Sequence, residues 1–216
     1  EGHEAIPEAD LLFVSVRRRT PAKEMMAMIR RHVAAGKPVV GIRTASHAFA
    51  ATPPSDRYAS WPEFDARVLG GNYRGHYGNK PPKDPPTHVM VVPAAAGHPV
   101  LTGVPGETLV STSHLYRNRG ASQEIVPLMV MEGRVKGQET IEPVTWVNTS
   151  EGRRVFYTSL GNRRDFELPA FRRLLLNGTL WALGRPVPPT VAPRGAGEAG
   201  PVPGRFQKPA GAEAVE

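Results

Sequence analysis

Hydrophobic residues follow two spacings in the first part of the chain. Residues 10–16, DLLFVSV, form a continuous apolar run with β-branched members, which is typical of a strand covered on both faces in a parallel sheet. In residues 20–37, TPAKEMMAMIRRHVAAGK, apolar side chains repeat at helical spacing until Gly36. Residues 38–42, PVVGI, then return to strand character. This order predicts one right-handed β-α-β crossover unit.

Further strand-like runs follow a middle segment, residues 50–88, that is rich in Pro, Gly and Tyr and is expected to form loops carrying a site above a sheet. Helical spacing returns in residues 168–184, LPAFRRLLLNGTLWALG. We therefore predict an α/β fold with three layers, α/β/α, and a mostly parallel, flavodoxin-like sheet. The later strands are expected at THVMVVP (87–93), ETLVSTSHLY (107–116), EIVPLMVMEG (124–133), EPVTWVNT (142–149) and GRRVFYTSL (152–160).

The length of 216 residues suits one domain, which we place at residues 1–184. Residues 185–216 are rich in Pro, Gly and Ala without periodicity and are expected to form a disordered tail. No apolar run approaches the roughly 20 residues that span a bilayer. The chain begins at Glu1 without a leader, so any signal peptide was removed or lies outside this sequence, and its localisation stays open.

Charge and cysteine content narrow the chemistry. The sequence contains no cysteine, which excludes disulfides, thiolate metal sites and a cysteine nucleophile. A net charge of +7 and an isoelectric point near 10 favour anionic partners. The arginines, including Arg17–Arg19, occur in scattered clusters without interleaved aromatic residues. That distribution favours a solvated basic face over a nucleic-acid-binding surface.

The stretch GKPVVGIRTASHAF, residues 36–49, is the first candidate for a site. A strand that turns abruptly into small residues lifts one side chain above the carboxyl edge of a sheet, where open α/β folds bind ligands. Arg43 occupies that position. Its permanent cation cannot act as a nucleophile, but it can hold a carboxylate, a phosphate or a developing oxyanion. The alternative, in which Arg43 pairs with a buried carboxylate, stays open.

Two histidines lie on loops that we expect to meet at this edge. His47 follows Ser46 in the same turn, and His76 lies near Tyr73 on a glycine-rich loop within residues 61–79. Either imidazole could act as a general base. Neither belongs to an HExxH or HxH pattern, so we predict no metal site and no cofactor.

Polar residues after later strands complete the candidate set. SHLYRN contributes His114 and Tyr116, and GNRRDF contributes Asn162 and Asp165. Polar groups just beyond strand ends are suited to ligand binding. Trp146 and Tyr157 are predicted to belong to the core.

Several segments together resemble the ThuA-like family, named for bacterial trehalose utilisation. They are GKPVVGIRTASHAF, WPEFDARVLGGNYRGH, GHPVLTGV, SHLYRN, PVTWV and GRRVFYTSLGNRRDFELPAFRRLLLNGTLWAL, and they extend over nearly the whole chain to residue 184. The resemblance implies a fold like that of class I glutamine amidotransferases, with one strand and one helix missing ahead of Glu1.

The same resemblance places the amidotransferase cysteine at Arg43 and its activating histidine at Asn162. Arg43 cannot attack a carbonyl and Asn162 cannot take up a proton near neutral pH, which excludes the amidotransferase reaction. Many ThuA-like members carry histidine at both positions, so this chain also departs from the commoner pattern of the family.

What the resemblance implies is a link to the catabolism of trehalose and 3-keto-glycosides, with a sugar oxidoreductase as a possible partner and homo-oligomers left open. Our first hypothesis is a lyase or hydrolase in which His47 or His76 removes a proton alpha to a 3-keto group and Arg43 stabilises the enolate. The residues expected to bind substrate are Ser46, Tyr73, His114, Tyr116, Asn162 and Asp165. Two alternatives are a non-catalytic module that binds a carbohydrate or a protein partner, and a hydrolase using Ser46, which lacks a G-x-S-x-G context.

Overall fold

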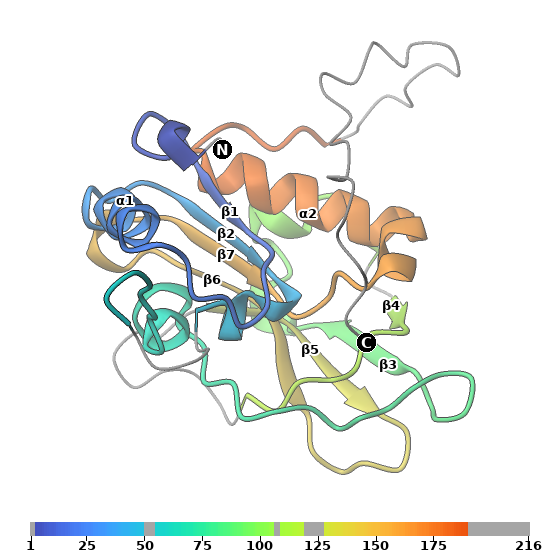
Figure 1. Ribbon diagram of the computed structural model, residues 1–216. Helices are drawn as coiled ribbons and strands as arrows, with labels where there is room; N and C mark the ends of the chain where they lie inside the picture. Colours follow the sequence, from blue (N-terminus) through green and yellow to red (C-terminus); the bar gives the residue numbers. More distant parts are fainter. Residues whose placement is uncertain (1–2, 50–54, 106–108, 119–127, 190–216) are drawn as a thin grey trace, which may run out of the picture.

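The computed structural model describes residues 3–49, 55–105, 109–118 and 128–189. Its centre is a seven-stranded sheet with the order β1-β2-β7-β6-β5-β3-β4 (Figure 1). Each strand overlaps the range that the hydrophobic pattern predicts. The strands are β1 (Leu12–Val14), β2 (Val39–Ile42), β3 (Thr87–Val91), β4 (Leu109–Ser111), β5 (Leu128–Val135), β6 (Glu142–Asn148) and β7 (Val155–Thr158).

The sheet combines a parallel part with a larger antiparallel part. β1 pairs with β2 and β2 with β7 in parallel, whereas β6–β7, β5–β6, β3–β5 and β3–β4 are antiparallel. The prediction of a mostly parallel sheet was therefore wrong. An apolar run predicts a buried strand but not its direction, and the short connections β5–β6 and β6–β7 return each strand directly alongside its predecessor.

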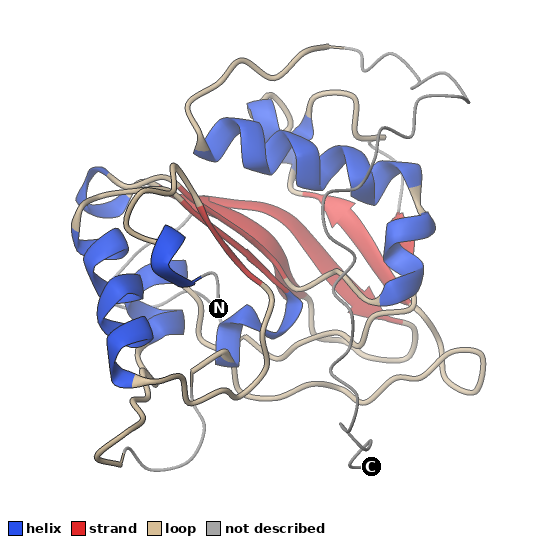
Figure 2. Cartoon of the chain, turned by 45° about the horizontal axis from the view of Figure 1, so that its top comes forward, coloured by secondary structure: helices blue, strands red, loops and turns tan. Residues whose placement is uncertain are grey.

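Two α-helices pack on opposite faces of the sheet, α1 (Lys23–Ala34) and α2 (Pro169–Ala182) (Figure 2). Both lie within the ranges that helical spacing predicts. A doubly wound fold carries several α-helices on each face of its sheet, whereas the described residues form one on each face. The predicted three-layer arrangement is therefore not confirmed.

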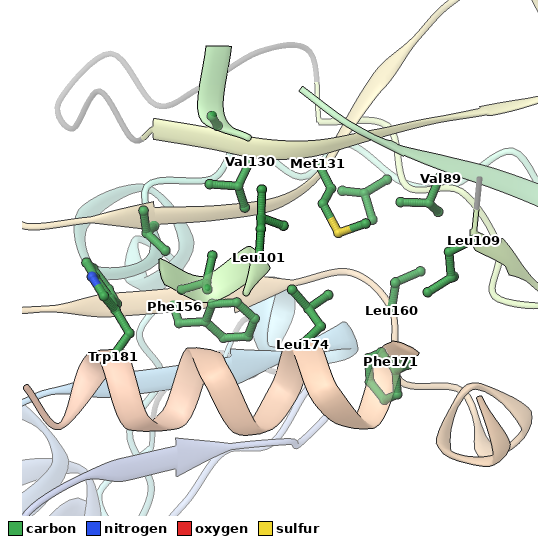
Figure 3. Packing of buried hydrophobic residues seen from close by; sticks show 14 of the residues in the cluster. Val89, Leu101, Leu109, Val130, Met131, Phe156, Leu160, Phe171, Leu174 and Trp181 are labelled. Atoms are coloured by element: carbon green, nitrogen blue, oxygen red, sulfur yellow. The ribbon is translucent and has the colours of Figure 1, made fainter. Parts of the chain in front are cut away.

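Side chains that alternate along β2 and β7 divide the core between these two faces. Phe156 packs with Leu174 and Trp181 of α2 (Figure 3), and Val40 belongs to the same cluster. On the other face lie Val39, Val155 and Tyr157, together with α1 and the short π-helix η3 (Asp65–Leu69). Trp146 and Tyr157 are fully buried, which confirms their predicted place in the core.

Close approach between α2 and the sheet depends on a glycine. A Cβ atom at Gly178 would lie 2.5 Å from Cγ of Phe156, which is far inside van der Waals contact. The absence of a Cβ atom at Gly178 thus allows α2 to approach β7 closely.

Two further expectations concern the ends and the surface of the chain. Most of the tail predicted at 185–216, namely residues 190–216, lies outside the described residues. None of the helices that the structure describes is long and apolar enough to cross a membrane.

Candidate functional site

The turn after β2 holds Arg43 in an uncommon backbone conformation. Its φ of 46° lies in the left-handed region, which costs a non-glycine residue about 1 to 2 kcal/mol. Tyr157 of the neighbouring strand β7 donates a hydrogen bond of 2.7 Å from its hydroxyl to the carbonyl oxygen of Arg43. Strained residues of this kind cluster at functional sites, and a buried partner keeps this one in place.

The side chain of Arg43 is coupled to a buried carboxylate through one hydroxyl. Arg43 Nη1 donates to Ser113 Oγ at 2.9 Å, and Ser113 Oγ donates to Asp165 Oδ2. Asp165 is fully buried and also accepts from Ser111 Oγ at 2.5 Å. Of the two alternatives for Arg43, the structure thus gives a link to a buried carboxylate through Ser113 rather than a direct ion pair.

Asp165 has a second function in the turn after β7. Its Oδ2 accepts from the backbone N–H groups of Gly161 and Asn162, at 2.8 and 3.0 Å. The side chain of Asn162 accepts from the N–H of Arg164 and donates to Thr112 Oγ1, each at 3.0 Å. The polar groups of this turn are therefore engaged with one another.

A pocket of about 460 Å³ opens beside Arg43. Four of its lining residues carry permanent or nearly permanent positive charge, three are histidines, and none of the described lining residues is a carboxylate. This composition suits a ligand or an intermediate with negative charge. The lining residues are Arg17, Arg18, Arg43, Thr44, His47, Tyr73, His76, Lys80, His114 and Tyr116.

The histidines of the pocket are held in their neutral form. Burial, followed by the charges of Arg18 and Arg17, lowers the pKa of His47 from 6.5 to about 4. Burial followed by the charge of Arg43 lowers the pKa of His76, and burial followed by His76 lowers that of His114. At neutral pH each ring therefore offers one nitrogen that accepts a proton or a hydrogen bond.

Ser46 gives His47 a defined partner. The Ser46 hydroxyl lies 3.1 Å from Nδ1 of His47 and 3.4 Å from the carbonyl oxygen of Arg43. A hydroxyl has one proton, so when Ser46 donates to the Arg43 carbonyl it accepts from His47 Nδ1–H. In that arrangement, Nε2 of His47 keeps its lone pair.

Contacts between rings build one wall of the pocket. The rings of His47 and Tyr73 stack with centroids 4.3 Å apart, and Tyr73 contacts Tyr116 edge-on at 4.8 Å. Burial raises the pKa of Tyr116 to about 12, so its hydroxyl stays protonated. His76 pairs with Tyr116 through an isolated antiparallel bridge, and its ring contacts that of His114 at 4.8 Å.

Asp65 anchors this wall from the interior. Its Oδ2 accepts from the backbone N–H of Tyr73 at 2.9 Å, while Oδ1 is buried without a hydrogen-bond partner. Burial raises the pKa of Asp65 to about 7, against the opposing effect of the Tyr73 N–H. A Cβ atom at Gly71 would lie 2.2 Å from Asp65 Oδ1, so only glycine fits there.

Six of the nine predicted site residues line this pocket: Arg43, His47, His76, Tyr73, His114 and Tyr116. The other three lie outside the lining, where Ser46 supports His47 and where Asn162 and Asp165 form the turn after β7. Sequence reasoning missed Arg17, Arg18 and Lys80, and it assigned the first two to a solvated basic face. The position of Arg17 and Arg18 just after a predicted strand was the signal that could have identified them. Across the residues that the structure describes, no three His, Asp or Glu side chains converge as a metal site requires.

Comparison with known proteins agrees with this fold. The family model ThuA, described as trehalose utilisation, matches residues 4–182. A ThuA-like protein from Bacteroides uniformis is 19% identical with a TM-score of 0.58, and the match covers 83% of this chain and 71% of that one. The corresponding values for a ThuA-like protein from Parabacteroides merdae are 18%, 0.56, 84% and 73%.

A third similar structure is much larger than this chain. The β-galactosidase from Rahnella sp. R3 is 13% identical with a TM-score of 0.53, and the match covers 83% of this chain but 23% of the enzyme. At these identities the structural matches establish a shared fold alone. No curated protein matches the sequence significantly.

Proposed function

The chain belongs to the ThuA family of trehalose utilisation, and from this membership and the pocket beside Arg43 we propose that it acts on a carbohydrate derivative such as a 3-keto-glycoside. The observation that carries the proposal is the combination of neutral histidines with arginines in one pocket. A neutral imidazole accepts a proton, and a guanidinium stabilises the negative charge that the carbon acid then develops.

The reaction that fits these groups is an elimination. His47 or His76 removes the proton on C2, and the electron pair of that bond forms the enolate of the 3-keto group. Arg43 stabilises the enolate oxygen, and Ser113 holds the guanidinium in place. The enolate then expels the glycosidic oxygen from C1, and the imidazolium returns its proton to that leaving group. The products are an unsaturated keto sugar and the free alcohol.

The cations of the pocket also act on the base. They lower the pKa of His47, which would make its imidazolium a strong acid and oppose proton abstraction. The enolate that forms beside the imidazolium compensates for this, because the two opposite charges appear together. An amidotransferase reaction is not expected, since Arg43 replaces the cysteine that would attack a carbonyl.

A non-catalytic carbohydrate-binding module is the second candidate. The observation that favours it is the exposure of His76 together with the low pKa of His47, because a base works best when its pKa lies near the working pH. In that function, Arg43 and the tyrosines would hold a sugar derivative without changing it.

Turnover separates the two candidates. The purified chain is incubated with a chromogenic 3-keto-glucoside and with its unoxidised parent, and release of the chromophore is followed. We expect release only from the keto compound, with losses of about 10² to 10³ for Arg43→Ala and of about 10² to 10⁴ for substitution of the base by Ala. The exposed Arg163→Ala serves as the control of equal charge. Binding without release in the wild type would reject catalysis in favour of the binding module.

The pH profile identifies the base. Activity should stay constant on the basic side of pH 6.5 and fall on acidification as the base becomes protonated. A midpoint near 4 indicates His47, whereas a midpoint well above 4 excludes His47 and leaves His76, whose pKa burial and the charge of Arg43 also lower. A loss of activity at basic pH instead would contradict a neutral imidazole as the base.

A further inference from the structure

The positive charge of the pocket exceeds what a transient enolate needs. One enolate oxygen is met by one guanidinium, and Arg43 supplies it. Arg17 and Arg18, which follow β1, and Lys80, which follows the glycine-rich loop, add three more cations around the same 460 Å³. These three come from segments separate from the Arg43 turn, so the excess is built from several parts of the fold.

These additional cations have no ion pair among the residues that the structure describes. Their effect is visible on the histidines, since Arg17 and Arg18 lower the pKa of His47 and Lys80 lowers that of His76. Arg19, the next residue, does not contribute to those shifts and does not line the pocket. The positive field therefore belongs to particular side chains rather than to the basic segment as a whole.

Backbone conformation points to the same residues. Arg18 has a φ of 45°, and Arg43 has a φ of 46°. These are two of the three non-glycine residues with positive φ in the described part of the chain. The backbone N–H of Arg18 donates to the carbonyl oxygen of His47 at 3.0 Å, which joins Arg18 to the far end of the turn that begins at Arg43. Both strained residues line the pocket.

We propose that this pocket binds a carbohydrate that already carries a negative charge before any reaction, either a phosphate ester or a carboxylate. The inference rests on the proposed function for its carbohydrate part. Arg17, Arg18 and Lys80 hold the charged group, while Arg43 remains available to the reacting oxygen. The partly exposed ring of Tyr73, held edge-on by the buried Tyr116, supplies the apolar surface on which a sugar ring packs.

A bound anion also changes the protonation of the pocket. The negative charge favours the imidazolium form, so binding takes up protons and affinity rises as the pH falls from 8 to 6. Asp84 is the one described carboxylate that raises the pKa of a pocket histidine, His114, and its effect there is smaller than those that lower it. Besides the imidazoles themselves, the charged groups that act on the three rings are Arg17, Arg18, Arg43, Lys80, Arg117 and Asp84. The rings of Tyr73 and Tyr116 contact that of His47.

Calorimetric titration of the full chain with four compounds tests the proposal: glucose 6-phosphate, glucuronate, glucose and inorganic phosphate. We expect at least one charged sugar to bind ten-fold or more tightly than glucose and more tightly than inorganic phosphate. The tighter of the two charged sugars identifies the charged group. Binding of glucose with equal affinity, or of inorganic phosphate with affinity equal to both charged sugars, would overturn the proposal.

Three variants locate the charged group. Arg17→Ala and Arg18→Ala should each weaken binding of the charged sugar at least five-fold without changing binding of glucose, whereas Arg19→Ala, equal in charge, should change neither. Equal losses of affinity in all three variants would show that the overall positive charge of residues 17–19 attracts the sugar, and would overturn the assignment of the charged group to Arg17 and Arg18. Glucuronate, which does not titrate between pH 6 and 8, serves for the pH series, and an affinity that is independent of pH there would contradict the coupling to the histidines.

The outcome separates this inference from the proposed function. Charged sugars that bind selectively while the 3-keto-glucoside stays intact support the inference and reject the elimination. A 3-keto-glucoside that is turned over while charge brings no gain in affinity supports the elimination and rejects the inference.

Discussion

Asp165 and Asp65 are two buried carboxyl groups behind the pocket, one linked to Arg43 through Ser113 and the other bonded directly to Tyr73, but their surroundings differ sharply. Asp165 accepts hydrogen bonds from two serine hydroxyls and two backbone N–H groups. Asp65 accepts one, from Tyr73, and its other oxygen has no partner. Four donors offset the cost of burying a charge, whereas one donor does not.

The difference shows how the protein separates support from binding. The fully bonded carboxylate fixes Ser113 and thereby Arg43, while the partly bonded one fixes the backbone of Tyr73. Neither lies in the pocket lining, where cations and neutral imidazoles meet the solvent. Acidic groups thus support the site from the interior and leave its positive charge uncompensated for a ligand.

The largest effect is expected from Asp165→Asn. The amide nitrogen replaces an acceptor by a donor, so at least one of the four donors loses its partner inside the core. We expect a loss of about 3 to 5 kcal/mol in the free energy of unfolding, measured in urea by circular dichroism. Glu167→Gln, an exposed change in the same short helix, should cost little. A loss below about 1 kcal/mol for Asp165→Asn would show that the four donors do not depend on its charge.

Asp65→Asn should instead increase the free energy of unfolding relative to wild type as the pH rises. The folded-state pKa of Asp65 is about 7 against an ordinary 3.8, so its contribution to stability is fully present below pH 3.8 and is lost as the pH rises through 7. Asn at this position does not titrate and still accepts from the Tyr73 N–H. Between pH 5 and pH 8 the stability of the variant should therefore rise relative to wild type by about 2 to 3 kcal/mol.

The difference between variant and wild type is the quantity to measure, because His47 titrates in the same range. Its lowered pKa gives a contribution that is present above pH 6.5 and is lost as the pH falls toward 4, opposite in direction to that of Asp65. Subtracting the free energy of unfolding of the wild type from that of the variant at each pH removes the contribution of His47, which both proteins share. A difference between Asp65→Asn and wild type that is constant from pH 5 to pH 8 would contradict the raised pKa of Asp65.

A pair of serine variants sharpens the comparison further. Ser111→Ala and Ser113→Ala each remove one hydroxyl from Asp165, and each should cost about 1 to 2 kcal/mol of stability. Only Ser113 also accepts from Arg43, so only Ser113→Ala should weaken binding or turnover of the sugar derivative. Equal functional losses in the two variants would mean that Arg43 is positioned by the turn rather than by Ser113.

The elements were more predictable from sequence than their pairing. Local spacing suffices for β2 and α2, because burial on two faces or along one stripe is visible within a few residues. The direction of β5 and β6 depends on which neighbour each strand meets, and an apolar run does not encode that. The parallel part of the sheet, β1-β2-β7, is where the predicted crossover unit was correct.

The candidate site shows the same division. The convergence of Arg43, His47 and His76 in one pocket follows from their places after a strand and on a long loop. The interior position of Asp165 could not be read in this way, because two of its donors, Ser111 and Ser113, lie more than 50 residues away in sequence. A polar residue after a strand is equally compatible with the pocket and with the turn beneath it.

The smallest expected effect is on stability at Arg18, where strain and binding are separable. Arg18→Gly removes the steric cost of a φ of 45°, whereas Arg18→Ala keeps a Cβ atom and hence the strain. We expect Gly to be more stable than Ala by up to about 1 kcal/mol, the gain being reduced by the greater freedom of glycine in the unfolded chain. Both variants should lose the same affinity for a charged sugar, because both remove the guanidinium. If Ala were as stable as Gly, Arg18 would carry no strain, and its conformation would no longer point to the pocket.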